Sequence, residues 1–498
     1  MDQITEAIAA FNNVYWYVVM ALLAVAGVWF TIRTVGVQVR MLPEMLRSVT
    51  AGSSTGPGDD GVSPFRAFTI SAASRVGTGN VAGVAIAIVL GGPGAVFWMW
   101  LLALLGGATA FVESTLAQLY KQKGSEGFFG GPAYYIRDGL RSKWLAMVFA
   151  VAITFTYGFV FNAVQSNSIS ESVQANWGQS ITTAWIVGVG LAVLTGLVIF
   201  GGVRRLSTVT NVVVPIMAVF YIILAIIVII VNITEVPAMF LHIVRHAFGM
   251  EQVAGAAVGM AMILHGVRRG MFSNEAGMGS APNAAATAAV SHPAKQGFVQ
   301  SLGVYFDTLI VCTATAFIIL LSNPTYGDKD ALGMVVTQGA LQQAVGQWAG
   351  PALTVIIFFL AWSSVLGNTY YGEANIRFLA GRHAGGAITV FRFLVLLCVI
   401  GGALAKVALV WDLADTFAAI MATINLIAIL PLGHLAVKLL KDYERKLKAG
   451  QDPHFHISDL PEARGVALWG AEDGTDVAGR DQLRGAGGDP LSAGSHRA

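Results

Sequence analysis

The sequence is poor in charge and in cysteine, and each shortage excludes a class of protein. Charged residues make up 12% of the 498 residues and hydrophobic ones 55%, whereas a typical soluble domain carries about 25% charged residues. A soluble fold of this composition would expose too much hydrocarbon to water, so a lipid bilayer is the expected environment. The two cysteines, Cys312 and Cys398, lie in apolar runs without a disulfide framework or zinc-ligand spacing. The small net charge of +2 argues against nucleic acid as a partner.

Several functional motifs are also missing. The sequence contains neither an HExxH motif nor a GxxxxGK[ST] loop, which disfavours a zinc hydrolase and an ATP-driven pump. It contains no filter-like repeat of the kind that builds an ion channel. The N-terminus lacks a basic region before its first apolar run, so that run is predicted to be a retained helix and not a signal peptide. A secondary transporter is the class that remains, with a membrane-embedded enzyme or a channel as the weakest alternatives.

Long apolar runs predict an all-α polytopic membrane protein with 11 transmembrane helices. A membrane-spanning helix needs roughly 20 apolar residues. Lysine and arginine gather in alternate loops, which places the N-terminus outside and the C-terminus in the cytoplasm and leaves few basic residues in the outer loops: Arg245, Lys329 and Lys406. The predicted spans are 14–36, 67–90, 95–120, 144–165, 181–200, 208–232, 252–290 (interrupted), 298–321, 350–379, 387–408 and 411–433.

The order of these spans indicates how the chain is divided. An outer N-terminus and an extra helix (1–36) and a cytoplasmic linker (37–66) precede a core of ten helices. The core is expected to comprise two sets of five, 67–232 and 233–437, the second including an outer amphipathic helix. Five is an odd number, so the two sets have opposite orientations in the membrane. The remaining residues, 438–498, are predicted to be a cytoplasmic tail that is disordered from about residue 450.

Glycine-rich breaks interrupt the first span of each set. Non-helical backbone at membrane depth is tolerated where it lines a cavity, and paired breaks in two halves indicate a transporter binding site. Free N–H groups there could hold a carboxylate, and free carbonyls a cation. The alternative is that the glycines only allow close helix packing. The residues concerned are Gly77, Gly79 and Gly83 in the first break, and Gly270, Gly277, Gly279 and Pro282 in the second.

Three motifs carry a resemblance to a known family. GGPGAVFWMW (91–100), GGPAYY (130–135) and FSNEAGMGSAP (272–282) resemble signatures of the alanine/glycine:cation symporter family. The resemblance implies sodium- or proton-coupled uptake of alanine and glycine across a bacterial-type inner membrane. It also implies alternating access, no cofactor other than the coupling ion, and a 5+5 inverted repeat like that of the leucine transporter with one extra N-terminal helix.

The resemblance further implies a substrate site. Residues 76–80 (VGTGN) resemble the VGLGN stretch of neurotransmitter:sodium symporters, in which amides at the positions of Thr78 and Gly79 hold the substrate carboxylate. Gln165 matches a family glutamine near the substrate, although a helix–helix hydrogen bond is an alternative role. Where this chain has Asn368 the family often has tryptophan, so Asn368 predicts a roomier or more polar pocket and a larger or different substrate. The other implied contacts are Phe272 and Ser273.

Two sodium sites are implied in the same way. Asn80 corresponds to a ligand of one site, and the carbonyl of Val76 to a ligand of another. Ser363 and Ser364 match two consecutive threonines whose hydroxyls complete the second site. Serine keeps the oxygen atom, and hard cations prefer oxygen ligands.

Charged residues within the apolar runs are functional candidates by default. Arg269 and Glu275 lie near each other across the second break and are predicted to form a buried ion pair. Three other carboxylates could be proton sites, gate charges paired with arginines, or solvated residues, and the last two roles are favoured: Glu113, Asp307 and Glu373.

Overall fold

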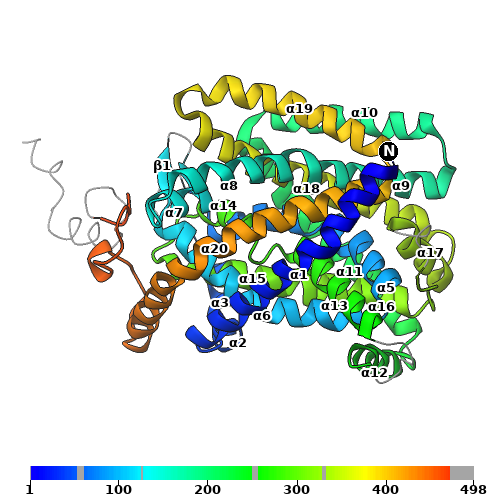
Figure 1. Cartoon of the computed structure of the whole chain (residues 1–498), viewed down its shortest axis with the longest axis horizontal. Helices are drawn as coiled ribbons and strands as arrows, with labels where there is room; N and C mark the ends of the chain where they lie inside the picture. Colours follow the sequence, from blue (N-terminus) through cyan, green and yellow to red (C-terminus); the bar gives the residue numbers. More distant parts are fainter. Residues whose placement is uncertain (1, 53–60, 125–126, 250–255, 328–332, 471–498) are drawn as a thin grey trace, which may run out of the picture.

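The computed structural model describes residues 2–52, 61–124, 127–249, 256–327 and 333–470, and these are almost entirely helical. Figure 1 shows the long helices packed side by side in one bundle. The first half of the described chain contains α1 (Asp2–Arg33), α2 (Val37–Arg40), α3 (Leu42–Thr50), α4 (Pro64–Arg75), α5 (Val84–Gly91), α6 (Gly94–Leu119), β1 (Gln122–Gly124), β2 (Gly127–Phe129), α7 (Pro132–Asp138), α8 (Lys143–Phe155), α9 (Phe161–Trp177), α10 (Ile181–Ile199) and α11 (Gly202–Val231).

Short π-helical segments join helices in both halves. They are Gly79–Gly83 between α4 and α5, Thr156–Val160 between α8 and α9, and Phe306–Cys312 between α15 and α16.

The second half repeats the pattern of long helices separated by short ones. The second half contains α12 (Val236–Ala247), α13 (Ala256–Asn274), α14 (Ala281–Ala285), α15 (Pro293–Tyr305), α16 (Thr313–Leu320), α17 (Met334–Val345), α18 (Ala349–Ala380), α19 (Ala384–Leu404) and α20 (Val407–Lys448).

Nine uninterrupted stretches of the described residues are long and apolar enough to cross a membrane. A tenth span is the pair Pro64–Arg75 and Gly79–Gly91, which is bent by 51°. The all-α polytopic class is therefore confirmed, whereas the count of eleven stays a prediction because α13 does not meet the same criterion. The nine stretches are Thr5–Arg33, Gly94–Leu119, Lys143–Trp177, Ile181–Ile199, Thr208–Val231, Pro293–Leu320, Ala349–Ala380, Ala384–Leu404 and Val407–Lys448.

Both predicted breaks are present, but Gly270, which was predicted to belong to the second, lies within helix α13. In the first, α4 ends at Arg75 and the chain resumes helical structure at Gly79. In the second, α13 ends at Asn274, and Glu275, Gly277 and Gly279 have φ values of 58°, 83° and 80° before α14 begins. Positive φ values favour glycine, so the glycines here permit a turn that other residues would resist. The breaks pack against each other, since α13 contacts α5 and the segment Gly79–Gly83.

The two ends of the bundle differ. The strands β1 and β2 form an antiparallel hairpin that lies at one end, together with α7, α14 and the last turns of α20. We call this the hairpin end. The first residues of α1 and the helix α17 lie toward the opposite end (Figure 1).

The predicted linker and the predicted tail are both more ordered than expected. The linker 37–66 contains α2 and α3, while its residues 53–60 lie outside the described residues. Disorder from about residue 450 is wrong for 451–470, because these residues fold back on the bundle and bury the side chains of Phe455 and Trp469. The composition of residues 451–470 is polar, but their few apolar side chains are buried against a surface that forms only when the core folds. Residues 471–498 lie outside the described residues.

Candidate functional site

The first break and α9 meet at Gln165. The backbone N–H of Thr78 donates to the Oε1 atom of Gln165 at 3.2 Å, and the Thr78 hydroxyl donates to the same oxygen. A side chain at Gly77 would collide with Ser364 of α18 and with Gln165. Thr78, Gln165 and Ser364 were predicted from separate parts of the sequence, and the structure brings them together around the break.

An aromatic group covers the same break. The ring of Phe272 on α13 lies with its centroid 4.5 Å from that of Phe161 and 4.8 Å from that of Trp411. A Cβ atom on Gly79 would lie 2.9 Å from the Phe272 ring. The structure thus places Phe272 against the first break, and Phe161 and Trp411 are aromatic neighbours that the sequence did not indicate. Nothing in their apolar runs distinguishes them from ordinary core residues.

A buried carboxylate lies beside Asn80. The Nδ2 atom of Asn80 donates to Oδ1 of Asp307 at 2.6 Å and to the Ser273 hydroxyl at 2.9 Å. Ser273 donates to the other Asp307 oxygen at 2.7 Å, and Thr308 donates there at 3.1 Å. All four side chains are 0% exposed. The structure therefore places Asp307 beside Asn80 and Ser273, two residues of the predicted site, and its signal in the sequence was a lone carboxylate within an apolar run.

The residues predicted for the second sodium site lie near the first break. Ser364 lies against Gly77, the residue after Val76. The hydroxyls of Ser363 and Ser364 each donate to the carbonyl of Leu360, at 2.7 and 3.1 Å, which leaves their lone pairs for another partner. Among the described residues no three or more His, Cys, Asp or Glu side chains gather as metal ligands. A cation held here would therefore rely largely on hydroxyl, carbonyl and amide oxygens, a set that suits sodium better than zinc.

Asn368 begins a chain of hydrogen bonds that reaches the second break. Ser74 lies within 2.7 Å of both the Asn368 Oδ1 atom and the Glu275 Oε1 atom. Ser280 donates to the other oxygen of Glu275 at 2.7 Å. The Nδ2 atom of Asn368 is buried and has no hydrogen-bond partner among the described residues. A buried donor without a partner is costly, so this amide is available to a ligand.

The predicted ion pair between Arg269 and Glu275 is wrong. Glu275 instead lies 4.0 Å from the guanidinium of Arg75, and Arg269 pairs with Asp415 of α20. The guanidinium of Arg269 also lies over the Trp411 ring at 4.6 Å. The physical reason is the left-handed backbone at Glu275, which separates its side chain from the helical face of Arg269.

Glu113 anchors the second break. One of its oxygens accepts the backbone N–H of Gly277 at 3.3 Å, and the other accepts the Nδ2 atom of Asn425 at 2.8 Å. Asn425 also donates to the Gly277 carbonyl at 2.9 Å and accepts the hydroxyl of Tyr135. Glu113 is 0% exposed, so it is not a solvated residue. Glu373, by contrast, forms a two-pronged ion pair with Arg392 at 2.6 and 2.9 Å.

Replacing Glu113 by alanine should destabilise the protein. The change leaves two buried groups, the Gly277 N–H and the Asn425 amide, without their acceptor, which costs about 1–3 kcal/mol. We expect a lower unfolding temperature for detergent-solubilised Glu113→Ala than for the unchanged protein. The control is Glu6→Ala, because Glu6 is an exposed carboxylate near the N-terminus. Equal unfolding temperatures for Glu113→Ala and Glu6→Ala would contradict the anchoring role.

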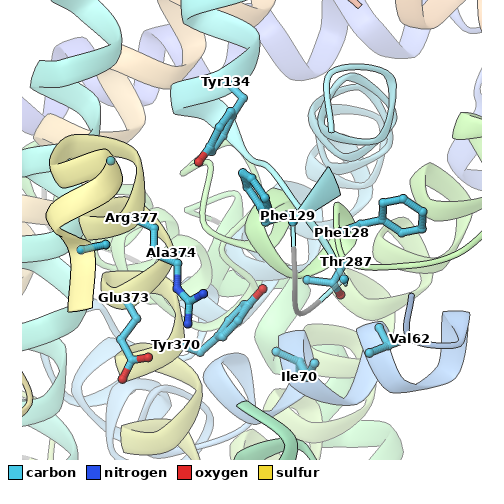
Figure 2. Close-up of a pocket in the computed structure, with 14 residues that line it drawn as sticks. Val62, Ile70, Phe128, Phe129, Tyr134, Thr287, Tyr370, Glu373, Ala374 and Arg377 are labelled. Atoms are coloured by element: carbon cyan, nitrogen blue, oxygen red, sulfur yellow. The ribbon is translucent and has the colours of Figure 1, made fainter. Parts of the chain in front are cut away.

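A separate cavity of ≈ 380 Å³ opens at the hairpin end. Figure 2 shows Tyr134, Tyr370 and Arg377 directed toward it, with Phe128 and Phe129 of the hairpin opposite. Burial raises the pKa of Tyr134 to about 12, so its hydroxyl stays protonated. The sequence did not reveal this cavity, because it is lined by four segments far apart in the chain. The first segment contributes Val62 and Ile70, and the second Gly124, Gly127, Phe128, Phe129 and Tyr134. The third contributes Thr287, and the fourth Tyr370, Glu373, Ala374, Arg377, Gly381 and Ala384.

Comparisons with known proteins show which chains this one is similar to. A model described as the sodium:alanine symporter family matches residues 1–457. Among similar Bacillus subtilis proteins are the amino-acid carrier protein AlsT, 50% identical over 92% of this chain and 96% of that protein, and the probable sodium/glutamine symporter GlnT, 48% identical over 95% and 98%. The sodium/alanine symporter AgcS of Methanococcus maripaludis is 37% identical over 87% and 95%.

A solved structure supports the fold. The crystal structure of MhsT in complex with L-phenylalanine aligns with 86% of this chain and 98% of that chain, with a TM-score of 0.54 and 14% sequence identity. At this identity the similarity concerns the fold alone. It confirms the predicted leucine-transporter-like class.

Proposed function

The chain belongs to the sodium:alanine symporter family, and from this premise we propose that it couples inward sodium flow to the uptake of small neutral amino acids such as alanine and glycine. It is a multi-pass membrane transporter and not an enzyme. The observation that carries the proposal is the meeting of two broken helices, where the Thr78 N–H bonds to Gln165, Gly79 lies against Phe272, and the Asn80 side chain bonds to Asp307.

The amides of Thr78 and Gly79 are proposed to hold the substrate carboxylate. In the present structure the Thr78 N–H and hydroxyl both donate to the carboxamide oxygen of Gln165. A carboxylate oxygen offers the same acceptor chemistry with a full negative charge, which makes these hydrogen bonds stronger. Gln165 would then turn to bond the ligand itself. The ring of Phe272, close to Gly79, would contact a small apolar side chain.

Two sodium sites are proposed beside this carboxylate. Asn80, Ser273 and Asp307 form a group of oxygen-bearing side chains whose negative charge fits a hard monovalent cation. The carbonyl of Val76 with the hydroxyls of Ser363 and Ser364 forms the second group. When sodium is bound it neutralises nearby carboxylate charge, and no further cofactor is needed. A proton in place of one sodium ion is the alternative coupling ion.

Asn368 favours a second candidate substrate, glutamine. Its unpartnered Nδ2 group is buried, and a side-chain carbonyl of the ligand would satisfy it. The relative GlnT, at 48% identity, is named a probable sodium/glutamine symporter, which supports an extended substrate range for this chain. An apolar side chain such as that of alanine leaves this donor unpaired.

Replacing Asn368 by leucine, which has a similar shape, should separate the two substrates. We expect competition by glutamine against alanine uptake to weaken by about tenfold, since one hydrogen bond in a buried site is worth roughly 1–1.5 kcal/mol, while alanine competition changes little. The matched control is Thr369→Ser, because the Thr369 hydroxyl donates to the Val365 carbonyl of its own helix and serine keeps that hydroxyl. Equal loss of competition by both amino acids would contradict a role in selectivity.

The working cycle is proposed to be alternating access. The broken helices α4–α5 and α13–α14, with α6 and α15–α16, would rock against the remaining helices. We assign residues 67–232 and 233–437 to the two inverted repeats and 1–36 to the extra helix. The hairpin end and the C-terminus are proposed to be cytoplasmic and the N-terminus external, in a bacterial-type inner membrane, on the basis of lysine and arginine placement.

Ligand-induced stabilisation of the purified protein tests the site. A ligand that binds only the folded state raises the unfolding temperature in proportion to the logarithm of its concentration. We expect alanine to raise it in sodium chloride and not in choline chloride, because the proposed sodium ions complete the carboxylate site. Stabilisation of equal size in both salts would contradict sodium coupling at this site.

A further inference from the structure

The C-terminal segment (residues 451–470) forms hydrogen bonds with the connecting segment (residues 286–292), which lies between α14 and α15. The backbone N–H of Phe455 donates to the Ser291 carbonyl at 2.8 Å, and the Ser291 hydroxyl donates to the Pro453 carbonyl at 2.9 Å. The C-terminal segment also contacts α20, because the ammonium of Lys446 donates to the His454 carbonyl at 2.6 Å. The C-terminal segment therefore links the connecting segment to the end of α20.

Trp469 contacts two residues that hydrogen-bond to the connecting segment. Its side chain is 0% exposed, and its Nε1 atom donates to the Gln118 carbonyl at 3.0 Å. The side-chain amide of Gln118 and the ammonium of Lys121 donate to the Ala288 carbonyl at 3.0 and 3.1 Å. The Lys121 ammonium lies between two rings, 4.4 Å from Trp469 and 4.2 Å from Phe128. Trp469 thus supports both residues that fix Ala288.

The connecting segment is also where the two broken segments meet at the hairpin end. The N–H of Val62, just before α4, donates to the Thr287 carbonyl at 3.2 Å, and the N–H of Ala289 donates to the Val62 carbonyl at 2.9 Å. Figure 2 shows Val62, Thr287 and Phe128 on one side of the cavity at this end. Separation of Val62 from the connecting segment would break these two hydrogen bonds and open this wall of the cavity.

We propose that the C-terminal segment stabilises the arrangement of the hairpin end in this structure, which we call closed because Val62 is hydrogen-bonded to the connecting segment, by holding the connecting segment where Val62 binds it. A contact made in only one of two conformations shifts the equilibrium toward that conformation. Loss of Trp469 frees the Gln118 carbonyl and uncovers Lys121, so Ala288 and its neighbours are held less firmly. The population with an open hairpin end then rises. This inference does not depend on the identity of the substrate.

Cysteine labelling measures that population without any transport assay. The reporter is Thr287→Cys, because Thr287 lines the cavity and is 7% exposed in the closed arrangement. Labelling by a water-soluble maleimide is followed in purified protein, and the signal of the unchanged protein with Cys312 and Cys398 is subtracted. We expect Trp469→Ala to speed labelling about fivefold or more through the population shift. The matched control is Arg464→Ala, since Arg464 is an exposed residue of the same segment.

Two further variants keep the test decisive. Trp469→Phe retains a ring but loses the bond to Gln118, so its labelling rate should lie between those of the unchanged protein and Trp469→Ala. If Trp469→Ala does not fold, Trp469→Phe takes its place and should still label faster than the unchanged protein. Ending the chain after Gly450 should speed labelling, whereas ending it after Gly470 should not. Unchanged labelling in a folded Trp469→Ala or Trp469→Phe protein overturns the proposal, as does equal acceleration by Arg464→Ala.

Discussion

Replacing Gly79 by leucine is expected to reduce alanine uptake about 100-fold or more, while the protein still inserts into the membrane. Even a single Cβ atom at this position would lie 2.9 Å from the Phe272 ring and 3.2 Å from the Ser273 Cα atom. Overpacking of a well-packed site costs typically about 1–3 kcal/mol, and the leucine side chain would also fill the space proposed for the substrate. The measurement is initial uptake of radiolabelled alanine into proteoliposomes.

A glycine elsewhere in the bundle provides the control. An added Cβ atom on Gly190 of α10 would meet no heavy atom of the described residues within 4 Å, its own helix backbone and chain neighbours aside, so Gly190→Leu should keep nearly full uptake. Both variants are compared at equal amounts of folded protein in the bilayer. Full uptake by a folded Gly79→Leu protein would show that the first break is only a packing device, which was the alternative drawn from the sequence.

The second large effect is expected from Asp307→Asn, which removes a buried negative charge and keeps the side-chain size. Asp307 accepts hydrogen bonds from Asn80, Ser273 and Thr308, so it is the source of negative charge in the first proposed sodium site. We expect the sodium concentration for half-maximal uptake to rise about tenfold or more, because a cation in a buried site depends strongly on nearby opposite charge. Uptake is measured over a range of sodium concentrations at constant ionic strength.

The control for this variant is Glu235→Gln, which neutralises an exposed carboxylate at the start of α12. Its sodium dependence should match that of the unchanged protein. Unaltered sodium dependence in Asp307→Asn would exclude Asp307 from the sodium site. If its uptake also lost its response to a proton gradient, the carboxylate would be a proton site, one of the roles left open by the sequence.

The two breaks could be predicted because their signal is local. Several glycines close together in an apolar run weaken a helix, and the left-handed backbone at Gly277 and Gly279 matches that expectation, whereas Gly106 and Gly107 lie within the unbroken helix α6. The resemblance of the motifs to a known family also predicts that Thr78 and Gln165 lie in the same site. Those two residues touch in the structure because α9 passes the first break.

Contacts that depend on tertiary packing were harder to predict. The sequence places Arg269 six residues from Glu275, yet their side chains diverge, and Arg269 finds Asp415 far along the chain. Asp307 was noticed as a charge in an apolar run, but only the folded structure places it beside Asn80. Trp469 lies in a polar stretch that reads as disordered, because the surface that buries it is formed by other segments.

The most direct test of the account is the accumulation of radiolabelled alanine in proteoliposomes of the purified protein. An inward sodium gradient, an inward proton gradient, or neither is imposed. The account predicts that the sodium gradient alone drives alanine above its external concentration, and that an ionophore which collapses the gradient releases it. Equal uptake without any gradient, which stops at the external concentration, would contradict coupled symport by this protein.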